Sequence, residues 1–204
     1  MSKKVEAIVI GWDGVLVDVL KNIHESYIEA FEAIKSPKAK TWTLKDTEKL
    51  QGKNPSSIFS DEILWEGKGD FARNAFYNTY DETNPVLKEG AEELMLLLCE
   101  LDCFAAVVSA KSQLILQNEV RSSKISGYID DVIGSLLGEP KRSKPAPGCW
   151  KRILDGITIK DPRQVLYIGK TSDKKFAESY GCEFIEVIGN GNALELVYNE
   201  VLKY

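Results

Sequence analysis

The stretch "AIVIGWDGVLVD", residues 7–18, decides the fold. An apolar run ends at a Gly-Trp-Asp-Gly turn, and a second apolar run leads to Asp18. This is the pattern of a buried strand that delivers acidic side chains into a site at its carboxyl end. One position where an acid is expected holds Gly11. The stretch therefore predicts the outline of a catalytic site and also questions whether the chemistry is still there.

Length and composition limit the class of protein. The 204 residues suffice for a full core, in one domain or in one domain that carries a smaller insert. A hydrophobic content of 44%, a charged content of 28% and a net charge of -5 argue against a general binder of nucleic acid or membrane surfaces. The apolar run after "MSKK" is too short, and broken too soon by Gly11, for a signal peptide or membrane span. We expect a cytoplasmic protein.

Cysteine and histidine chemistry is not indicated. The four cysteines are spaced for neither a zinc site nor a disulfide framework, so we expect reduced and mostly buried thiols. The single histidine, His24, lies in a helical pattern and is interpreted as a helix residue, which argues against a histidine-based nucleophilic mechanism.

Short, β-branched, mostly apolar runs alternate with helical patterns over most of the chain. Such runs suit strands that are buried on both faces, and the alternation predicts a parallel sheet. The predicted strands are residues 5–10, 103–109, 130–135, 165–169 and 182–189. Residues 19–84 interrupt this order with helical patterns alone, so they are predicted to form a separate helical lobe.

Four motifs in sequence order resemble the haloacid dehalogenase-like superfamily, specifically its phosphoglycolate phosphatase and β-phosphoglucomutase branch. "GWDGVLVD" (11–18) takes the place of "DxDGTLxD", and "AAVVSAKS" (105–112) supplies a strand that ends in Ser109. "KPAP" (144–147) is intact, and "GKTSDKKFAESYG" (169–181) takes the place of "GDxxxD". The resemblance covers about residues 5 to 189. It implies a Rossmann-like α/β core, residues 1–18 and 85–204, with an inserted all-helical cap domain, residues 19–84.

The resemblance also assigns roles to single positions. In the family the first Asp is the nucleophile, the second is the acid/base, and the first and fourth motifs supply carboxylates for Mg²⁺. Here these positions hold Gly11 as the lost nucleophile, Asp13 as the degenerate acid/base, and Lys170 in place of a metal-binding acid. Gly11 has no side chain to attack phosphorus, and loss of a nucleophile costs roughly 10⁶-fold in subtilisin.

We expect no cofactor. Mg²⁺ is expected for the family but disfavoured here, because an ammonium at Lys170 repels a divalent cation and is placed to pair with Asp13. Asp173 is a metal ligand only if a metal site survives. Lys144 and Lys170 would balance Asp13 and Asp173 without a metal.

The retained residues predict an anion site, with Gly14, Ser109, Lys144 and Lys170 as phosphate-binding residues. The residues that the chain retains from the motifs also have structural alternatives. Asp13 and Gly14 suit a tight turn, Ser109 suits a helix N-cap, Lys144 suits a solvated loop, and Asp173 suits a cap of the next helix. Trp12, Trp42, Trp65 and Phe71 are interpreted as packing residues.

Three functions remain open on the sequence alone. The first is a catalytically impaired pseudo-phosphatase that binds phosphate or a small phosphorylated metabolite. The second is an active hydrolase of small phosphate esters with non-standard chemistry at Asp13. The third is a structural or partner-binding protein with an empty pocket. The substrate, the oligomeric state and any protein partner are not indicated.

Overall fold

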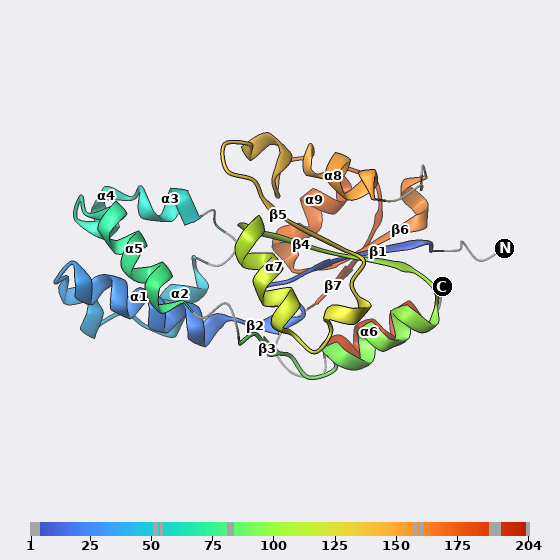
Figure 1. The fold of residues 1–204 in the computed structure, drawn as a ribbon, viewed down its shortest axis with the longest axis horizontal. Coiled ribbons are helices and arrows are strands. Elements are labelled where there is room, and N and C mark those ends of the chain that lie inside the picture. The colour runs from blue at the N-terminus through green and yellow to red at the C-terminus, as the bar shows by residue number, and fades with distance from the viewer. Residues whose placement is uncertain are drawn as a thin grey trace. The chain divides into compact units, whose positions relative to one another are not determined.

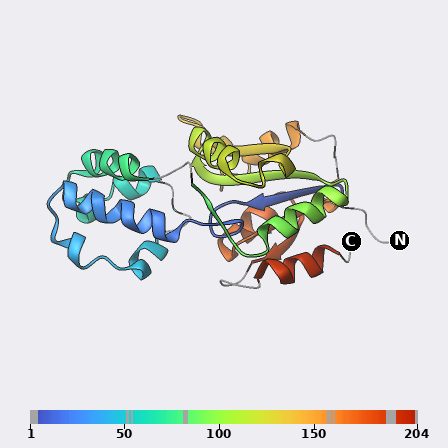
Figure 2. The same cartoon turned by 60° about the horizontal axis from the view of Figure 1, so that its bottom comes forward.

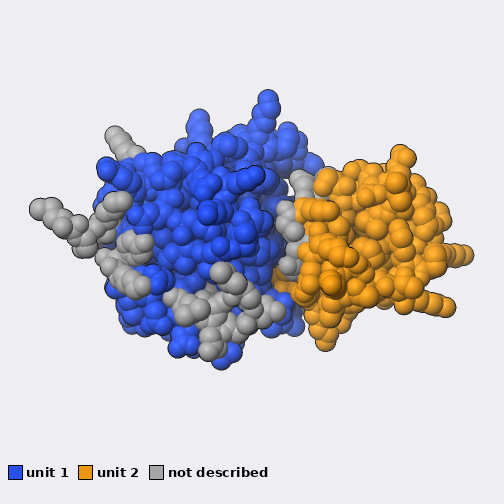
Figure 3. All heavy atoms as spheres, turned by 180° about the vertical axis from the view of Figure 1, so that it is seen from behind, with its two compact units in different colours: residues 1–18, 83–204 blue, residues 19–82 orange. Residues whose placement is uncertain are grey.

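The computed structural model describes residues 5–50, 53, 55–80, 84–156, 159, 161–187 and 193–202. The chain divides into two compact units, which Figure 3 colours separately. Unit 1 contains residues 1–18 and 83–204, and unit 2 contains residues 19–82. The division falls two residues from the predicted second boundary and at the predicted first one.

Unit 1 is built on a five-stranded sheet with the order β5-β4-β1-β6-β7. Every neighbouring pair is parallel, as predicted from the continuous apolar runs. The strands are β1 (Ala7–Gly11), β4 (Phe104–Ser112), β5 (Asp131–Ser135), β6 (Val165–Gly169) and β7 (Glu183–Glu186). Residues 188 and 189 of the last predicted strand lie outside the described residues. The predicted α/β Rossmann-like core is confirmed.

Helices cover both faces of this sheet (Figures 1 and 2). On one face α8 and α9 pack on alternate strand residues such as Val9 and Tyr167, with Trp150 and Phe176 in the layer between. Helices α6 and α10 lie together on the opposite face, and α7 packs against β4 and β5. The bounds are α6 (Ala91–Glu100), α7 (Gln113–Ser122), α8 (Cys149–Asp155), α9 (Lys174–Glu178) and α10 (Ala193–Val201).

A second, two-stranded sheet in unit 1 was not predicted. β2 (Val17–Asp18) and β3 (Val86–Leu87) pair antiparallel, with Val17 opposite Leu87 and Asp18 opposite Val86. The ladder lies where the chain leaves unit 1 and where it returns to it. Two-residue strands carry too little periodicity to be recognised in a sequence.

Unit 2 is helical throughout its described residues, in agreement with the predicted helical insert. It contains α1 (Leu20–Ala33), α2 (Leu44–Glu48), α3 (Pro55–Phe59), α4 (Glu62–Trp65) and α5 (Gly69–Thr79). Aromatic rings form its core: Phe31 stacks on Trp65 with centroids 4.5 Å apart, and Tyr27 lies 4.9 Å from Phe76. The packing interpretation is wrong for Phe71, whose residue surface is 61% exposed.

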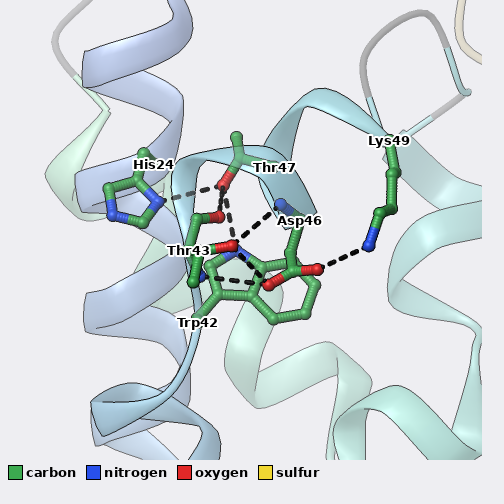
Figure 4. A network of polar contacts seen from close by, with 6 residues as sticks. All are labelled: His24, Trp42, Thr43, Asp46, Thr47 and Lys49. Carbon is green, nitrogen blue, oxygen red and sulfur yellow. Dashed lines mark hydrogen bonds and ion pairs between the residues drawn. The ribbon is translucent and has the colours of Figure 1, made fainter.

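His24 lies in α1, as predicted, and joins a network of polar contacts within unit 2 (Figure 4). Its Nδ1 lies 3.0 Å from Thr47 Oγ1, which also accepts a hydrogen bond from Trp42 Nε1 at 2.9 Å. Next to it, Thr43 and Asp46 form a capping box at the start of α2. The network fixes the short α2 against α1, so His24 has a structural role here.

Short 3₁₀ segments complete the fold, at Pro37–Lys40, Ser126–Tyr128, Pro140–Arg142, Pro162–Gln164 and Thr171–Asp173. All four cysteines are free thiols, but only Cys149 and Cys182 are buried. Within the described parts of the chain, no helix is both long and apolar enough to cross a membrane.

Candidate functional site

The candidate site lies at the carboxyl end of β1, between β4 and β6. The chain runs from β1 to a neighbour on each side, which makes this edge the switch point where α/β sheets bind ligands. The register places Gly11 opposite Val108, so Ser109 lies just beyond it. Ser109 Oγ donates a hydrogen bond to Asp13 Oδ2 at 2.8 Å. The structure thus brings together two residues that the sequence separates by 96 positions.

Lys111 completes the surroundings of Asp13. Its Nζ lies 2.7 Å from Asp13 Oδ1 and 2.6 Å and 2.8 Å from the two carboxylate oxygens of Glu119. Trp12, directly before Asp13, donates from Nε1 to Glu119 Oε2 at 2.5 Å. Trp12 is buried, which confirms its interpretation as a packing residue, and it also anchors this carboxylate.

These contacts keep both partners charged. Burial alone would raise the pKa of Asp13, but the Lys111 ammonium, with hydrogen bonds from Lys111 and Ser109, holds it below its ordinary value. Burial would lower the pKa of Lys111, but Asp13 and Glu119 hold it above its ordinary value. A carboxylate of lowered pKa that is already bonded through both oxygens is a weak base and a poor proton donor.

A second buried ion pair lies on the other side of β1. Lys144 Nζ lies 2.8 Å from Asp173 Oδ1, and the side chains are 11% and 7% exposed. Asp173 Oδ2 accepts a hydrogen bond from the backbone N–H of Lys170 at 3.1 Å. Lys144 also lies 5.6 Å from the ring centroid of Tyr167, within the range of a cation–π contact.

Lys170 lies against the turn after β1. Gly14 has a φ of +72°, and a Cβ there would lie 3.1 Å from Lys170 Cδ and 3.3 Å from its Nζ. Burial lowers the pKa of Lys170, Lys144 and Lys111 lower it further, and Asp13 and Asp173 oppose this. The expected ion pair between Lys170 and Asp13 is not formed, because Lys111 takes that position.

Gly11 lies between the two ion pairs. A Cβ built at Gly11 would lie 2.9 Å from Val15 Cγ2 and 3.3 Å from Asp173 Oδ2. A side chain at position 11 would therefore emerge directly beside Asp173. No oxygen of residue 11 itself is available there as a nucleophile.

A comparison with models of known protein families identifies the family of this chain. The model of the haloacid dehalogenase-like hydrolase family matches residues 8–187. The chain belongs to this family. No curated protein sequence matches the chain.

Solved structures of haloacid dehalogenase-like proteins share the fold. A predicted phosphatase from Clostridium acetobutylicum superposes with a TM-score of 0.81 at 17% identity, covering 98% of this chain and 100% of that one. A predicted phosphoglycolate phosphatase from Haemophilus somnus gives 0.80 at 19% identity, covering 93% and 88%. A haloacid dehalogenase-like hydrolase from Streptococcus pneumoniae gives 0.77 at 20% identity, covering 100% and 99%. At these identities the likeness establishes the fold alone.

The residues of this haloacid dehalogenase-like site do not fit Mg²⁺. Mg²⁺ is held by carboxylate oxygens and waters, but Asp13 Oδ1 and Asp173 Oδ1 each lie within 2.8 Å of a lysine ammonium. Gly11 supplies no carboxylate, and Lys170 places a positive charge where the family has an acid. Among the described residues no group of three or more potential acidic, cysteine or histidine ligands converges on one point.

The structural alternatives are resolved for several residues. Ser112, not Ser109, is the N-cap of α7, with its side chain accepting from Ile115 N–H. The cap interpretation of Ser109 is therefore wrong. Asp173 makes no side-chain cap to α9, and Lys144 is held in the buried ion pair instead of lying in a solvated loop.

Sequence reasoning missed three residues of the site. Lys111 contacts Asp13 directly, and Glu119 is connected to Asp13 through Lys111. Lys88 Nζ donates a hydrogen bond to the carbonyl of Gly14 at 2.8 Å. A signal existed for Glu119, because it lies on the buried face of α7 with Leu116 and Val120. A charged residue on an apolar helix face needs a partner, which indicates a buried ion pair. It does not single out Lys111, because Arg121 and Lys124 lie nearer to Glu119 in sequence.

Proposed function

We propose that this chain is a catalytically impaired haloacid dehalogenase-like protein that binds inorganic phosphate or a small phosphorylated metabolite without hydrolysing it. The observation that carries the proposal is Gly11 at the end of β1, where the family has the phosphoryl acceptor. The place that its side chain would take borders Asp173, which is already bound by Lys144. Nothing at this position attacks phosphorus.

The charge of the site supports binding of an anion. Four lysines surround the turn after β1, namely Lys88, Lys111, Lys144 and Lys170. Lys111 and Lys144 form ion pairs with carboxylates, whereas no described carboxylate forms an ion pair with Lys170. Lys170 therefore has an ammonium available for a ligand oxygen.

The contacts of Asp13 argue against hydrolysis by a relocated mechanism. Asp13 would have to act as base or nucleophile, but Lys111 and Ser109 bind its two oxygens and its pKa is lowered. Such a group neither accepts a proton readily nor has a free lone pair directed at a substrate. No observation specifically favours a purely structural role.

Calorimetry tests the binding proposal. We expect wild-type protein to bind phosphate and its analogue tungstate with millimolar affinity or better, with and without EDTA. Lys170→Met should weaken binding about tenfold, as expected for loss of one charge-assisted hydrogen bond. Lys151→Met removes an exposed lysine from α8 and should leave the affinity unchanged. Absence of binding at millimolar phosphate contradicts the proposal.

A phosphatase screen tests the loss of hydrolysis. We expect no turnover of small phosphate esters, with or without Mg²⁺, above the level of Asp13→Asn protein purified in parallel. Turnover by the wild type that Asp13→Asn abolishes would instead support the relocated mechanism.

We also infer that this protein is cytoplasmic, because its cysteines are free thiols. Four unpaired cysteines suit a reducing compartment.

A further inference from the structure

The Lys111 ammonium lies inside a cage of carboxylate oxygens. Three of them surround Nζ: Asp13 Oδ1 at 2.7 Å and the two oxygens of Glu119 at 2.6 Å and 2.8 Å. The two carboxylates come from different parts of unit 1, the turn after β1 and the middle of α7. One cation therefore connects the first strand to a helix more than a hundred residues away.

The cage is largely closed to solvent. The side chains of Lys111 and Glu119 are 12% and 2% exposed, and that of Asp13 is 22% exposed. Two buried carboxylates that face each other need a cation or a proton between them, because their repulsion and desolvation are costly. Two neutral groups also donate hydrogen bonds to these carboxylates, Ser109 Oγ to Asp13 and Trp12 Nε1 to Glu119. Lys111 supplies positive charge at bonding distance from both carboxylates.

We infer that Lys111 is the resident cation of this site, a tethered ammonium that draws Asp13 and Glu119 together as a bound divalent ion would. The inference concerns the protein without ligand and does not depend on phosphate binding. It also gives a physical reason for the poor fit to Mg²⁺, because the carboxylate next to the strand end is already occupied by a cation of this chain.

The inference predicts that removal of the ammonium uncovers a metal site. In Lys111→Met the apolar chain remains, but Asp13 and Glu119 face each other across the volume that Nζ filled. Two carboxylates and added waters are a ligand set for Mn²⁺ or Mg²⁺. Lys144→Met is the matched control, because it also frees a buried carboxylate, Asp173, but brings no second carboxylate to the same point.

Thermal unfolding of the full chain in EDTA and in MnCl₂ tests this. Wild-type protein and Lys144→Met should show no shift of the midpoint with Mn²⁺. Lys111→Met should have a lower midpoint than wild type in EDTA. It should recover roughly 3 °C or more when Mn²⁺ is present at about ten times its dissociation constant. Electron paramagnetic resonance of Mn²⁺ should show one bound ion per Lys111→Met chain and none per wild-type chain.

If Lys111→Met does not fold, the double variant Lys111→Met/Glu119→Gln still tests the inference. It removes one positive and one negative charge, so it should be more stable than Lys111→Met and should not respond to Mn²⁺. If the double variant is no more stable than the single one, Lys111 acts through packing and the inference is wrong. It is also wrong if Lys111→Met folds but binds no Mn²⁺, or if wild-type protein binds Mn²⁺ equally well.

Discussion

At the scale of the residue, position 11 places a glycine beside a carboxylate and a valine methyl group. Gly11→Asp alone would press its Cβ on Val15 and place a new carboxylate next to Asp173. We expect it to lower the free energy of unfolding by about 1–3 kcal/mol, from overpacking and like-charge repulsion. Urea unfolding of both proteins measures this, and an unchanged midpoint would show that the site relaxes more than its packing indicates.

Adding Lys170→Asp to Gly11→Asp tests how far the site has diverged. The double variant restores both acids that the family has at these positions, and it removes the cation that repels a metal. We expect its thermal midpoint to rise on addition of Mg²⁺, whereas that of the wild type stays constant. If phosphatase activity appears together with this response, the absence of the two acids alone accounts for the loss of activity. A metal response without activity would place further loss elsewhere, with Lys111 on Asp13 as the first candidate.

Tyr167 links stability to alkaline pH. Burial and the nearby charge of Asp173 raise its pKa well above the ordinary value of 10.0, and burial raises that of Cys182 from 9.0 to about 12. These groups stay neutral in the folded protein while the unfolded chain loses their protons. Their stabilising contribution is therefore complete below pH about 9 and is lost as pH rises through the folded-state pKa values.

We expect Tyr167→Phe to reduce this alkaline loss. The difference in unfolding free energy between wild type and Tyr167→Phe should change between pH about 8 and 11 in favour of the variant. The lowered pKa of Lys170 makes its contribution to stability increase with pH, opposite to that of Tyr167. Lys170 is present in both proteins, so its contribution cancels in the difference between them. Urea unfolding across this pH range measures the difference, and two parallel curves would show that Tyr167 does not titrate differently on unfolding.

At the scale of the element, two serines three residues apart have different roles, one in capping a helix and one in the candidate site. Ser112 caps α7, whereas Ser109 donates to Asp13. Ser112→Ala should cost about 1 kcal/mol of unfolding free energy and leave phosphate affinity unchanged. Ser109→Ala should weaken phosphate binding. Parallel urea unfolding and calorimetry distinguish them, and equal effects of the two changes on affinity would exclude a special role for Ser109.

The core of unit 2 depends on one helix. Phe31 on α1 is fully buried and stacks on Trp65, with Trp42 4.9 Å away between ring centroids. Phe31→Ala should cost about 3–5 kcal/mol because it leaves a cavity among aromatic rings. Near-ultraviolet circular dichroism during urea unfolding follows these rings. A cost below about 1 kcal/mol would mean that the aromatic core collapses around the cavity.

The long apolar strands could be predicted from the sequence because each is buried on both faces and so reads as a continuous run. Within the predicted helical lobe, the segment "NPSSIFSDEILWEG" contains two helices, α3 and α4. Asp61 explains the break, because its side chain accepts from Leu64 N–H at 2.8 Å and starts a new helix. An Asp within a short helical pattern reads equally well as an exposed helix residue.

The site could be predicted only where a motif fixed it. Asp13, Ser109, Lys144 and Asp173 were found because their order along the chain resembles a family pattern. Lys111 and Glu119 were not, because their contact depends on how α7 packs beside the turn after β1, which no local spacing encodes. The partner of Asp13 was therefore expected to be Lys170, the lysine that the motifs had already placed nearby.

At the scale of the whole molecule, the chain contains one discontinuous unit and one continuous unit inserted into it. The length of the chain left open one domain or one domain with an insert, and the change from mixed to purely helical patterns located the insert.

The small β2–β3 ladder should allow the inserted unit to be removed or replaced. Because Asp18 lies opposite Val86, the two chain ends that flank residues 19–85 are already held at hairpin distance. An Asn-Gly dipeptide in place of the 19–85 segment should therefore close the gap without moving the main sheet, and a foreign helical lobe spliced at the same two points should be tolerated as well. Exchange of the inserted unit between relatives at these two points would leave Lys88, Lys111, Lys144 and Lys170 unchanged, because all four belong to unit 1.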